Sequence, residues 1–258
     1  MDLGFVLAVL GAGFGAGFVM TAVGAGSLVS FPILIGVGLS PLVANVSNNV
    51  GLVAGGLSGA FGFRRELAGH RHLVVRVSLA SGLGALLGAV LLLALPPGAF
   101  ANVVPYLVLI AATLVGLGPV ISAGVRRRAA RRGTVVATDR ERMGPGLNGL
   151  ATLVGVYGGY FGAAQGVLLL AVLALGLDVG LQTINGLKNV AVLAANVAAS
   201  VVFVFYAPLD WAVVGLIAIG SVVGGWLGAH VGRRLPPAVF RALIVVLGYA
   251  VGVKLLLA

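Results

Sequence analysis

Hydrogen-bond donors gather in two short stretches of a chain that is otherwise almost entirely apolar. The two stretches contain Asn45, Asn48 and Asn49, and Asn185, Lys188 and Asn189. In each trio the first and last residues are four apart, a spacing that places them on one face of a helix. Amide N–H groups and an ammonium together suit the recognition of an oxyanion. The alternative is that the asparagines only join neighbouring helices, where such bonds contribute about 0.6 kcal/mol each.

Glycine-rich breaks interrupt the apolar segments next to these trios. They read Gly24-Ala25-Gly26 and Gly162-Ala163-Ala164-Gln165-Gly166. A helix that restarts after such a break offers free backbone N–H groups and a positive dipole end, which favour an anion. The alternative is close packing, because small residues let membrane helices approach each other. The candidate substrate contacts beside the breaks are Ser27, Tyr160 and Gln165. The glycines that we expect to serve packing alone are Gly17, Gly84, Gly88, Gly224 and Gly228.

The composition indicates an all-α integral membrane protein. Of the 258 residues, 60% are hydrophobic and only 9% are charged, whereas a soluble domain has about 25% charged residues. Every arginine lies in one of three short stretches, at 64–76, 126–142 and 233–241. This distribution follows the positive-inside rule. The net charge of +10 therefore indicates cytoplasmic loops beside anionic lipid, and we expect no nucleic-acid partner.

Lys188 is the most informative of the candidate residues. The other lysine, Lys254, lies near the C-terminus, where its side chain can reach the membrane interface. A charge near the bilayer centre costs about 2.5–3.5 kcal/mol on insertion scales, so such a residue usually faces a cavity or a partner. We expect Lys188 to supply a positive charge to an anionic substrate. The alternative is that its side chain extends to the cytoplasmic headgroups.

Apolar segments follow one another along the whole chain. They are expected at 3–22, 26–39, 42–63, 73–95, 101–122, 147–161, 163–177, 182–206, 211–232 and 239–257. A full span needs about 20 residues, so the segments at 26–39, 147–161 and 163–177 are short. Short segments joined through glycine are typical of broken or re-entrant helices.

Polar and small residues recur at a fixed offset of 140 residues, the separation of Asn45 from Asn185. The same offset pairs Asn48 with Lys188, Asn49 with Asn189, Gly84 with Gly224, Gly88 with Gly228, and Leu95-Pro96-Pro97 with Leu235-Pro236-Pro237. The sequence therefore predicts two related halves of about five hydrophobic segments each, at 1–122 and 147–258. Residues 123–146 would form a basic linker between them.

Equivalent loops of the two halves differ in charge. The loop at 64–72 is basic, whereas its counterpart near 206–210 has no basic residue. The loop at 95–100 is uncharged, whereas its counterpart at 233–241 carries arginines. Basic loops face the cytoplasm, so the repeat is expected to be inverted. Each half then crosses the cell membrane an odd number of times, as five spans or as three spans plus a re-entrant hairpin. Either arrangement puts both termini outside and the linker in the cytoplasm.

Catalytic patterns are missing from the sequence. The histidines, His70, His72 and His230, do not have the spacing of a zinc or haem site. There is no cysteine and no phosphate-binding loop of the Walker type. We therefore expect no enzyme activity, no metal and no cofactor.

Four motifs carry a resemblance to a known family. They are Ser27-Leu28-Val29-Ser30-Phe31-Pro32, Ala44-Asn45-Val46-Ser47-Asn48, residues 157–166, and Asn185-Gly186-Leu187-Lys188-Asn189. The chain resembles the sulfite exporter TauE/SafE family, also called the 4-toluene sulfonate uptake permease family, over nearly its whole length. The resemblance implies a permease that moves sulfite, sulfonates or related organosulfur anions. The break at 24–26 departs from the fuller glycine run that the family often has, and this departure bears on the site's geometry.

The expected mechanism is alternating access, with both breaks meeting near the membrane centre. Export of a monovalent anion from a negative interior is downhill by about 2.3 kcal/mol per 100 mV, so export needs no coupling ion. An anion channel, or an uptake carrier for another small organic anion, stays open as an alternative. The expected partners are the lipid bilayer and a small anionic substrate. The oligomeric state stays open, a homodimer included.

Overall fold

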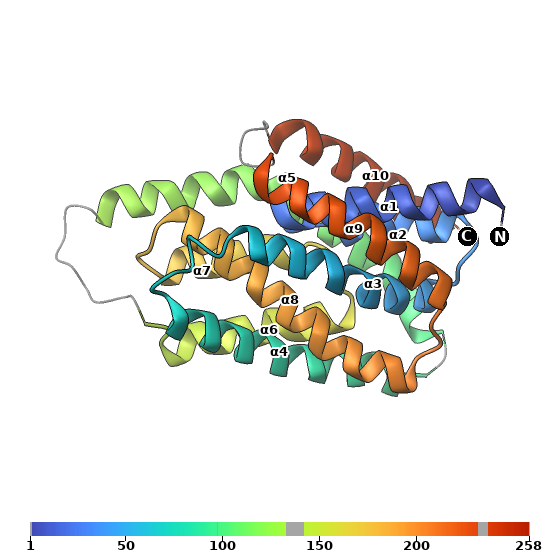
Figure 1. The fold of residues 1–258 in the computed structure, drawn as a ribbon, viewed down its shortest axis with the longest axis horizontal. Helices are drawn as coiled ribbons and strands as arrows, with labels where there is room; N and C mark the ends of the chain where they lie inside the picture. The colour runs from blue at the N-terminus through green and yellow to red at the C-terminus, as the bar shows by residue number, and fades with distance from the viewer. Residues whose placement is uncertain (1, 97, 133–141, 232–236, 258) are drawn as a thin grey trace.

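The chain folds into a bundle of helices that run along the long dimension of the molecule (Figure 1). The computed structural model describes residues 2–96, 98–132, 142–231 and 237–257. Within these residues the regular elements are helices: α1 (Leu3–Ala22), α2 (Ser27–Gly36), α3 (Pro41–Gly62), α4 (Arg71–Ala94), α5 (Ala99–Arg132), α6 (Pro145–Tyr160), α7 (Gln165–Gly176), α8 (Leu181–Tyr206), α9 (Trp211–His230) and α10 (Pro237–Leu257). The expected all-helical fold is confirmed. Of the residues that define the arginine stretches and the repeat, those outside the described part of the chain are Arg140, Arg233, Arg234, Pro97, Leu235 and Pro236.

Five of the described helices are long and apolar enough to cross a membrane, namely α1, α4, α8, α9 and the part of α5 at Ala99–Val120. The outer face of α4 illustrates why lipid must cover this surface. Leu79, Leu83 and Leu87 recur every four residues along it, and each is about 60% exposed. Such an apolar band has no counterpart on a water-soluble protein. The chain is therefore a multi-pass membrane protein.

Small residues let the buried faces of the helices approach closely. Helix α1 packs against α9, and α4 packs against α6. A Cβ atom added at Gly17 would lie 2.7 Å from Cα of Ser221, and one at Gly84 would lie 3.0 Å from Cα of Gly155. Gly88, Gly224 and Gly228 also touch the backbone of the facing helix. The expected packing role of these glycines is confirmed.

Helices α2 and α7 fold back along the helices that precede them. A Cβ at Gly15 would meet Cγ1 of Val29 at 3.0 Å, so α2 runs alongside the second part of α1. In the same way, a Cβ at Gly176 would meet Cδ1 of Leu147 at 2.6 Å, so the end of α7 lies beside the start of α6. The predicted breaks fall at residues 23–26 and 161–164, between these helices. Each pair therefore forms a helical hairpin with a glycine-rich tip.

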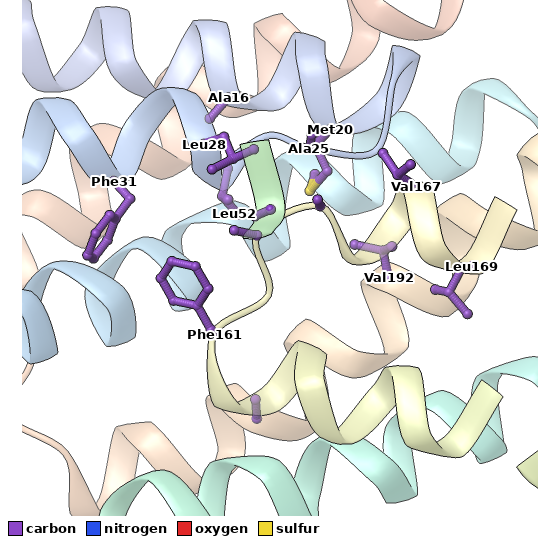
Figure 2. Close-up of a cluster of buried hydrophobic side chains, with 14 of the residues drawn as sticks. Ala16, Met20, Ala25, Leu28, Phe31, Leu52, Phe161, Val167, Leu169 and Val192 are labelled. Atoms are coloured by element: carbon purple, nitrogen blue, oxygen red, sulfur yellow. The ribbon is translucent and has the colours of Figure 1, made fainter. Parts of the chain in front are cut away.

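The tips of the two hairpins touch each other. The backbone N–H of Gly166 donates a hydrogen bond to the carbonyl oxygen of Gly24 at 3.0 Å. Gly24 has a φ of +93°, a conformation that favours glycine. Figure 2 shows Val167, which follows this contact, beside the loop of the first break. Phe161 from the second break packs edge-on against Phe31 of α2, with ring centroids 5.4 Å apart.

The two ends of the bundle hold different parts of the chain. Figure 1 places the start of α1 and the end of α10 at one end, and the end of α5 at the other. Beside the start of α6, Nη1 of Arg76 donates to the carbonyl of Met143 at 2.8 Å. At the opposite end, the N–H of Asp210 donates to Oγ of Ser47 at 3.0 Å. Helix α5 continues through residue 132, so it extends into the range 123–146 that we expected to be a linker.

Candidate functional site

Lys188 is buried in the middle of the bundle and contacts the end of α1. Only 1% of its surface is exposed. Its Nζ donates a hydrogen bond to the carbonyl oxygen of Thr21 at 3.0 Å. The last carbonyls of a helix lack partners within the helix and carry a partial negative charge, so an ammonium is favourable there. The interpretation in which Lys188 extends to the headgroups is wrong, because its ammonium points into the protein.

Two asparagines contact the same helix break as Lys188. Nδ2 of Asn189 donates to the carbonyl of Thr21 at 3.4 Å, next to the ammonium. Nδ2 of Asn48 donates to Oγ of Ser27 at 3.2 Å. Residue 21 lies in the last turn of α1, and residue 27 begins α2. Helix α8 therefore contacts one side of the first break and α3 contacts the other.

Buried polar atoms without a partner lie at both breaks. They are Oγ1 of Thr21, Oδ1 of Asn48 and Oε1 of Gln165. An unpaired buried polar atom costs about 1–3 kcal/mol, so such atoms need a reason to persist. Both amides are bonded to hydroxyls, Asn48 to Ser27 and Gln165 to Ser81. A hydroxyl donates as well as accepts, so either amide can turn and present its NH₂ group to an anion.

The starts of α2 and α7 supply further donors. Neither helix has a side-chain cap at its N-terminus. The N-cap residue of α7, Ala164, has a left-handed backbone with a φ of 61°. The partial positive charge of a helix start therefore lies at each break. These helix starts add backbone N–H donors to the ammonium and the amide groups, although the neighbouring ends of α1 and α6 carry the opposite partial charge.

The structure places the other predicted residues in three different surroundings. Asn45 donates to the main-chain carbonyl of Tyr160 at 3.1 Å, so these two residues lie at the second break. The ring of Tyr160 contacts Phe100 with centroids 5.7 Å apart. Gln165 is 1% exposed, and its amide reaches α4. Asn185 is half-buried on α8, almost one turn before Lys188.

Asn49 belongs to a separate buried network between α3 and α8. Its Nδ2 donates to Oδ1 of Asn196 at 3.4 Å, and Oγ of Ser200 donates to its Oδ1 at 3.2 Å. Nδ2 of Asn196 also contacts Sδ of Met20 at 4.0 Å. This arrangement agrees with the interpretation that some asparagines join helices. Sequence reasoning identified Asn196 as a polar residue of an apolar segment without assigning it a substrate contact, and it did not select Ser200.

Thr21 is a polar residue of the first break whose contacts sequence reasoning did not predict. Its carbonyl oxygen accepts hydrogen bonds from both Lys188 and Asn189, and its own hydroxyl is buried without a hydrogen-bond partner. Every residue type has a main-chain carbonyl, so the sequence does not indicate which carbonyl accepts these bonds. The available signal is the position of a lone hydroxyl just before a glycine-rich break. Lys188 and Asn189 thus contact the end of α1, and Asn48 contacts the start of α2, on the two sides of the first break.

Comparison with known proteins gives results that agree with this architecture. Residues 9–255 match the family described as sulfite exporter TauE/SafE. The chain is 26% identical over 247 residues to the probable membrane transporter protein ORF9 of a Sinorhizobium species, covering 95% of this chain and 90% of that protein. It is 24% identical over 259 residues to a probable membrane transporter protein of Haemophilus influenzae, covering 99% and 96%. No solved structure matches the chain.

Proposed function

The chain belongs to the sulfite exporter TauE/SafE family of membrane transporters, and we propose that it carries a small sulfur-containing anion such as sulfite or an organosulfonate. The observation that carries the proposal is the buried ammonium of Lys188 at the first break. It shares the carbonyl of Thr21 with the amide of Asn189, and carboxylates occur only outside the helices that the structure describes. A group of this kind is stabilised when an anion binds beside it.

The substrate contacts in this proposal follow the two breaks. Lys188, Asn189, Asn48 and Ser27 would bind the anion from the first break. Asn45, Tyr160 and Gln165 would complete the site from the second break, which touches the first through Gly24 and Gly166. Asn185 would contribute from α8, whereas Asn49 is bonded to Asn196 and Ser200 and would join α3 to α8 instead.

We propose alternating access between two inverted halves as the mechanism. The packing of the helices supports this. In the two halves, α1 corresponds to α6, α3 to α8 and α4 to α9. The packing of α1 on α9 then corresponds to the packing of α6 on α4, and the packing of α3 on α9 corresponds to that of α8 on α4. The hairpins α1–α2 and α6–α7 start from opposite ends of the bundle and meet at their tips. A site between two such halves is exposed alternately when one half rocks against the other.

Export is the direction that this site can perform without a coupling ion. A monovalent anion leaves a negative interior downhill by about 2.3 kcal/mol per 100 mV. Uptake against the same potential would need a co-transported cation, and the helices that the structure describes carry no carboxylate for it.

Flux into proteoliposomes tests the proposal. Radiolabelled sulfite and sulfonates are offered to wild-type protein and to Lys188→Ala, with Lys254→Ala as the matched control because Lys254 is exposed near the end of α10. Saturable flux that is lost in Lys188→Ala and kept in Lys254→Ala supports a carrier with Lys188 in its site. Flux that does not saturate, together with measurable conductance, would indicate an anion channel. Equal flux in all three proteins removes Lys188 from the site.

A further inference from the structure

The first break contains one full charge among neutral groups. Among the residues whose side chains the structure describes, Lys188 is the only charged residue that is buried. The described acidic residues, Asp2, Glu66, Asp178 and Asp210, all lie before or between helices. The ammonium donates to the main-chain carbonyl of Thr21, and the amide of Asn189 donates to the same oxygen.

The helix ends at this break add little net charge. Four residues separate the end of α1 at residue 22 from the start of α2 at residue 27. A helix C-terminus carries about −0.5 of an elementary charge and an N-terminus about +0.5. The two ends therefore nearly cancel when seen by a ligand of ordinary size. What remains is the single positive charge of Lys188.

We infer that the site selects anions by their charge, and that it takes anions with one negative charge in preference to anions with two. This inference rests on the proposed function and specifies its substrate. One ammonium compensates one negative charge, so a divalent anion would leave a second charge buried without a partner, which is strongly unfavourable. Hydrogen sulfite and monosulfonates fit this rule, whereas doubly charged sulfite and sulfate do not. We expect flux of divalent anions to be at least about 100-fold slower.

Asn48 is a position at which a second positive charge can be introduced beside the first break. It stands at the 140-residue offset from Lys188 and contacts the same break from the opposite helix. Its side chain is 2% exposed, so a lysine in its place would hold a second ammonium inside the protein. Asn48→Lys is therefore expected to move the preference from monovalent towards divalent anions. Asn48→Gln, which adds length without charge, is the matched control.

Two probes of similar shape separate charge from size. Methanesulfonate carries one negative charge, and sulfate carries two on a similar tetrahedral frame. Flux of both is measured in proteoliposomes for wild type, Asn48→Lys and Asn48→Gln, after size-exclusion chromatography has shown that each variant is folded. The double variant Asn48→Lys/Lys188→Asn moves the charge across the break while keeping one charge in total, so it should keep the wild-type preference.

Perchlorate, a monovalent tetrahedral anion without sulfur, distinguishes this inference from the proposed function. Two results together support both the proposed sulfur substrate and the charge rule, which is the preference for anions with one negative charge. Wild type moves methanesulfonate with little sulfate, and the ratio of sulfate flux to methanesulfonate flux rises only in Asn48→Lys. If wild type moves perchlorate but not methanesulfonate, the proposed sulfur substrate is overturned and the charge rule is supported. Sulfate moving as fast as methanesulfonate in wild type overturns the charge rule alone, as does an unchanged ratio in folded Asn48→Lys. Folded wild type that moves none of the three anions overturns both.

Discussion

The ammonium nitrogen of Lys188 lies 3.0 Å from the main-chain carbonyl oxygen of Thr21, and this bond joins α8 to the last turn of α1. The two residues belong to different halves of the chain. A substrate anion beside Lys188 would share the ammonium with this carbonyl, because the ammonium has three donors. Binding of the anion and the position of the end of α1 are therefore expected to depend on each other.

A carboxylate placed beside Lys188 should replace the substrate. Asn189 donates to the same carbonyl oxygen as Lys188, so Asn189→Asp brings a negative charge next to the ammonium. The resulting internal ion pair competes with the anion, and we expect flux to fall by at least ~10-fold. Flux in proteoliposomes measures the effect. Asn189→Ala removes the amide without adding a charge, so its flux should fall less than that of Asn189→Asp. An Asn189→Asp protein as active as Asn189→Ala would contradict a role for Lys188 in anion binding.

Glycine at residue 24 is required by the contact between the two hairpin tips. Gly24 and Gly38 have similar positive φ angles, +93° and +97°. A Cβ at Gly24 would lie 2.7 Å from Cα of Gly166, whereas a Cβ at Gly38 has open space. Gly38→Ala should therefore cost only the backbone strain, about 1–2 kcal/mol. Gly24→Ala should cost more and should also reduce flux, because it separates the tips. Thermal unfolding in detergent measures the difference, and equal melting temperatures would show that the tips do not pack as described.

Close packing of α4 on α6 depends on individual glycines. Gly88 touches the carbonyl of Val156, and no Cβ fits between them. Gly82 lies on the same helix, and a Cβ there would find its nearest atom 3.6 Å away, at the carbonyl oxygen of Ala194. We expect Gly88→Ala to destabilise the protein by about 1–3 kcal/mol, the usual cost of overpacking. Gly82→Ala should leave the stability nearly unchanged or raise it slightly, because alanine favours helices. Thermal unfolding of the two variants checks this, and equal losses would refute it.

The features that sequence reasoning predicted are those that depend on local composition. The two breaks follow from runs of glycine, and the packing positions follow from glycines such as Gly84 and Gly224 in apolar segments. Burial of Lys188 was predicted because a lysine inside an apolar segment needs a partner. Its partner was not predictable, since the carbonyl of Thr21 is a main-chain group that any residue would offer.

The direction in which each asparagine points was also beyond the sequence. Asn45 and Asn49 lie on one helix face, yet Asn45 contacts Tyr160 and Asn49 contacts Asn196. The rotation of α3 against α6 and α8 decides these contacts, and it is set by the packing of the whole bundle. Tyr160 was selected for its side chain, whereas its carbonyl accepts the hydrogen bond.

The network of Asn49, Asn196 and Ser200 should show measurable coupling between α3 and α8. Asn49 bonds to both partners inside the protein. A double-mutant cycle of Asn49→Ala and Asn196→Ala should give a coupling free energy of about 0.6 kcal/mol, and up to about 1.7 kcal/mol, as for other bonds between membrane helices. Unfolding in detergent gives the four stabilities. Additive effects would show that the two amides do not interact.

The inverted orientation of the halves can be tested at two equivalent loop positions. Ala68 and Pro208 stand at the 140-residue offset, in the loop before α4 and the loop before α9, and both are exposed. The chain has no cysteine, so a single introduced cysteine is labelled without background. We expect Pro208→Cys to react with a membrane-impermeant maleimide on intact cells. Ala68→Cys should react only after the membrane is opened, because its loop is basic and we expect basic loops to face the cytoplasm. Labelling of both cysteines from the same side would make the halves parallel and would remove the basis for alternating access between inverted halves.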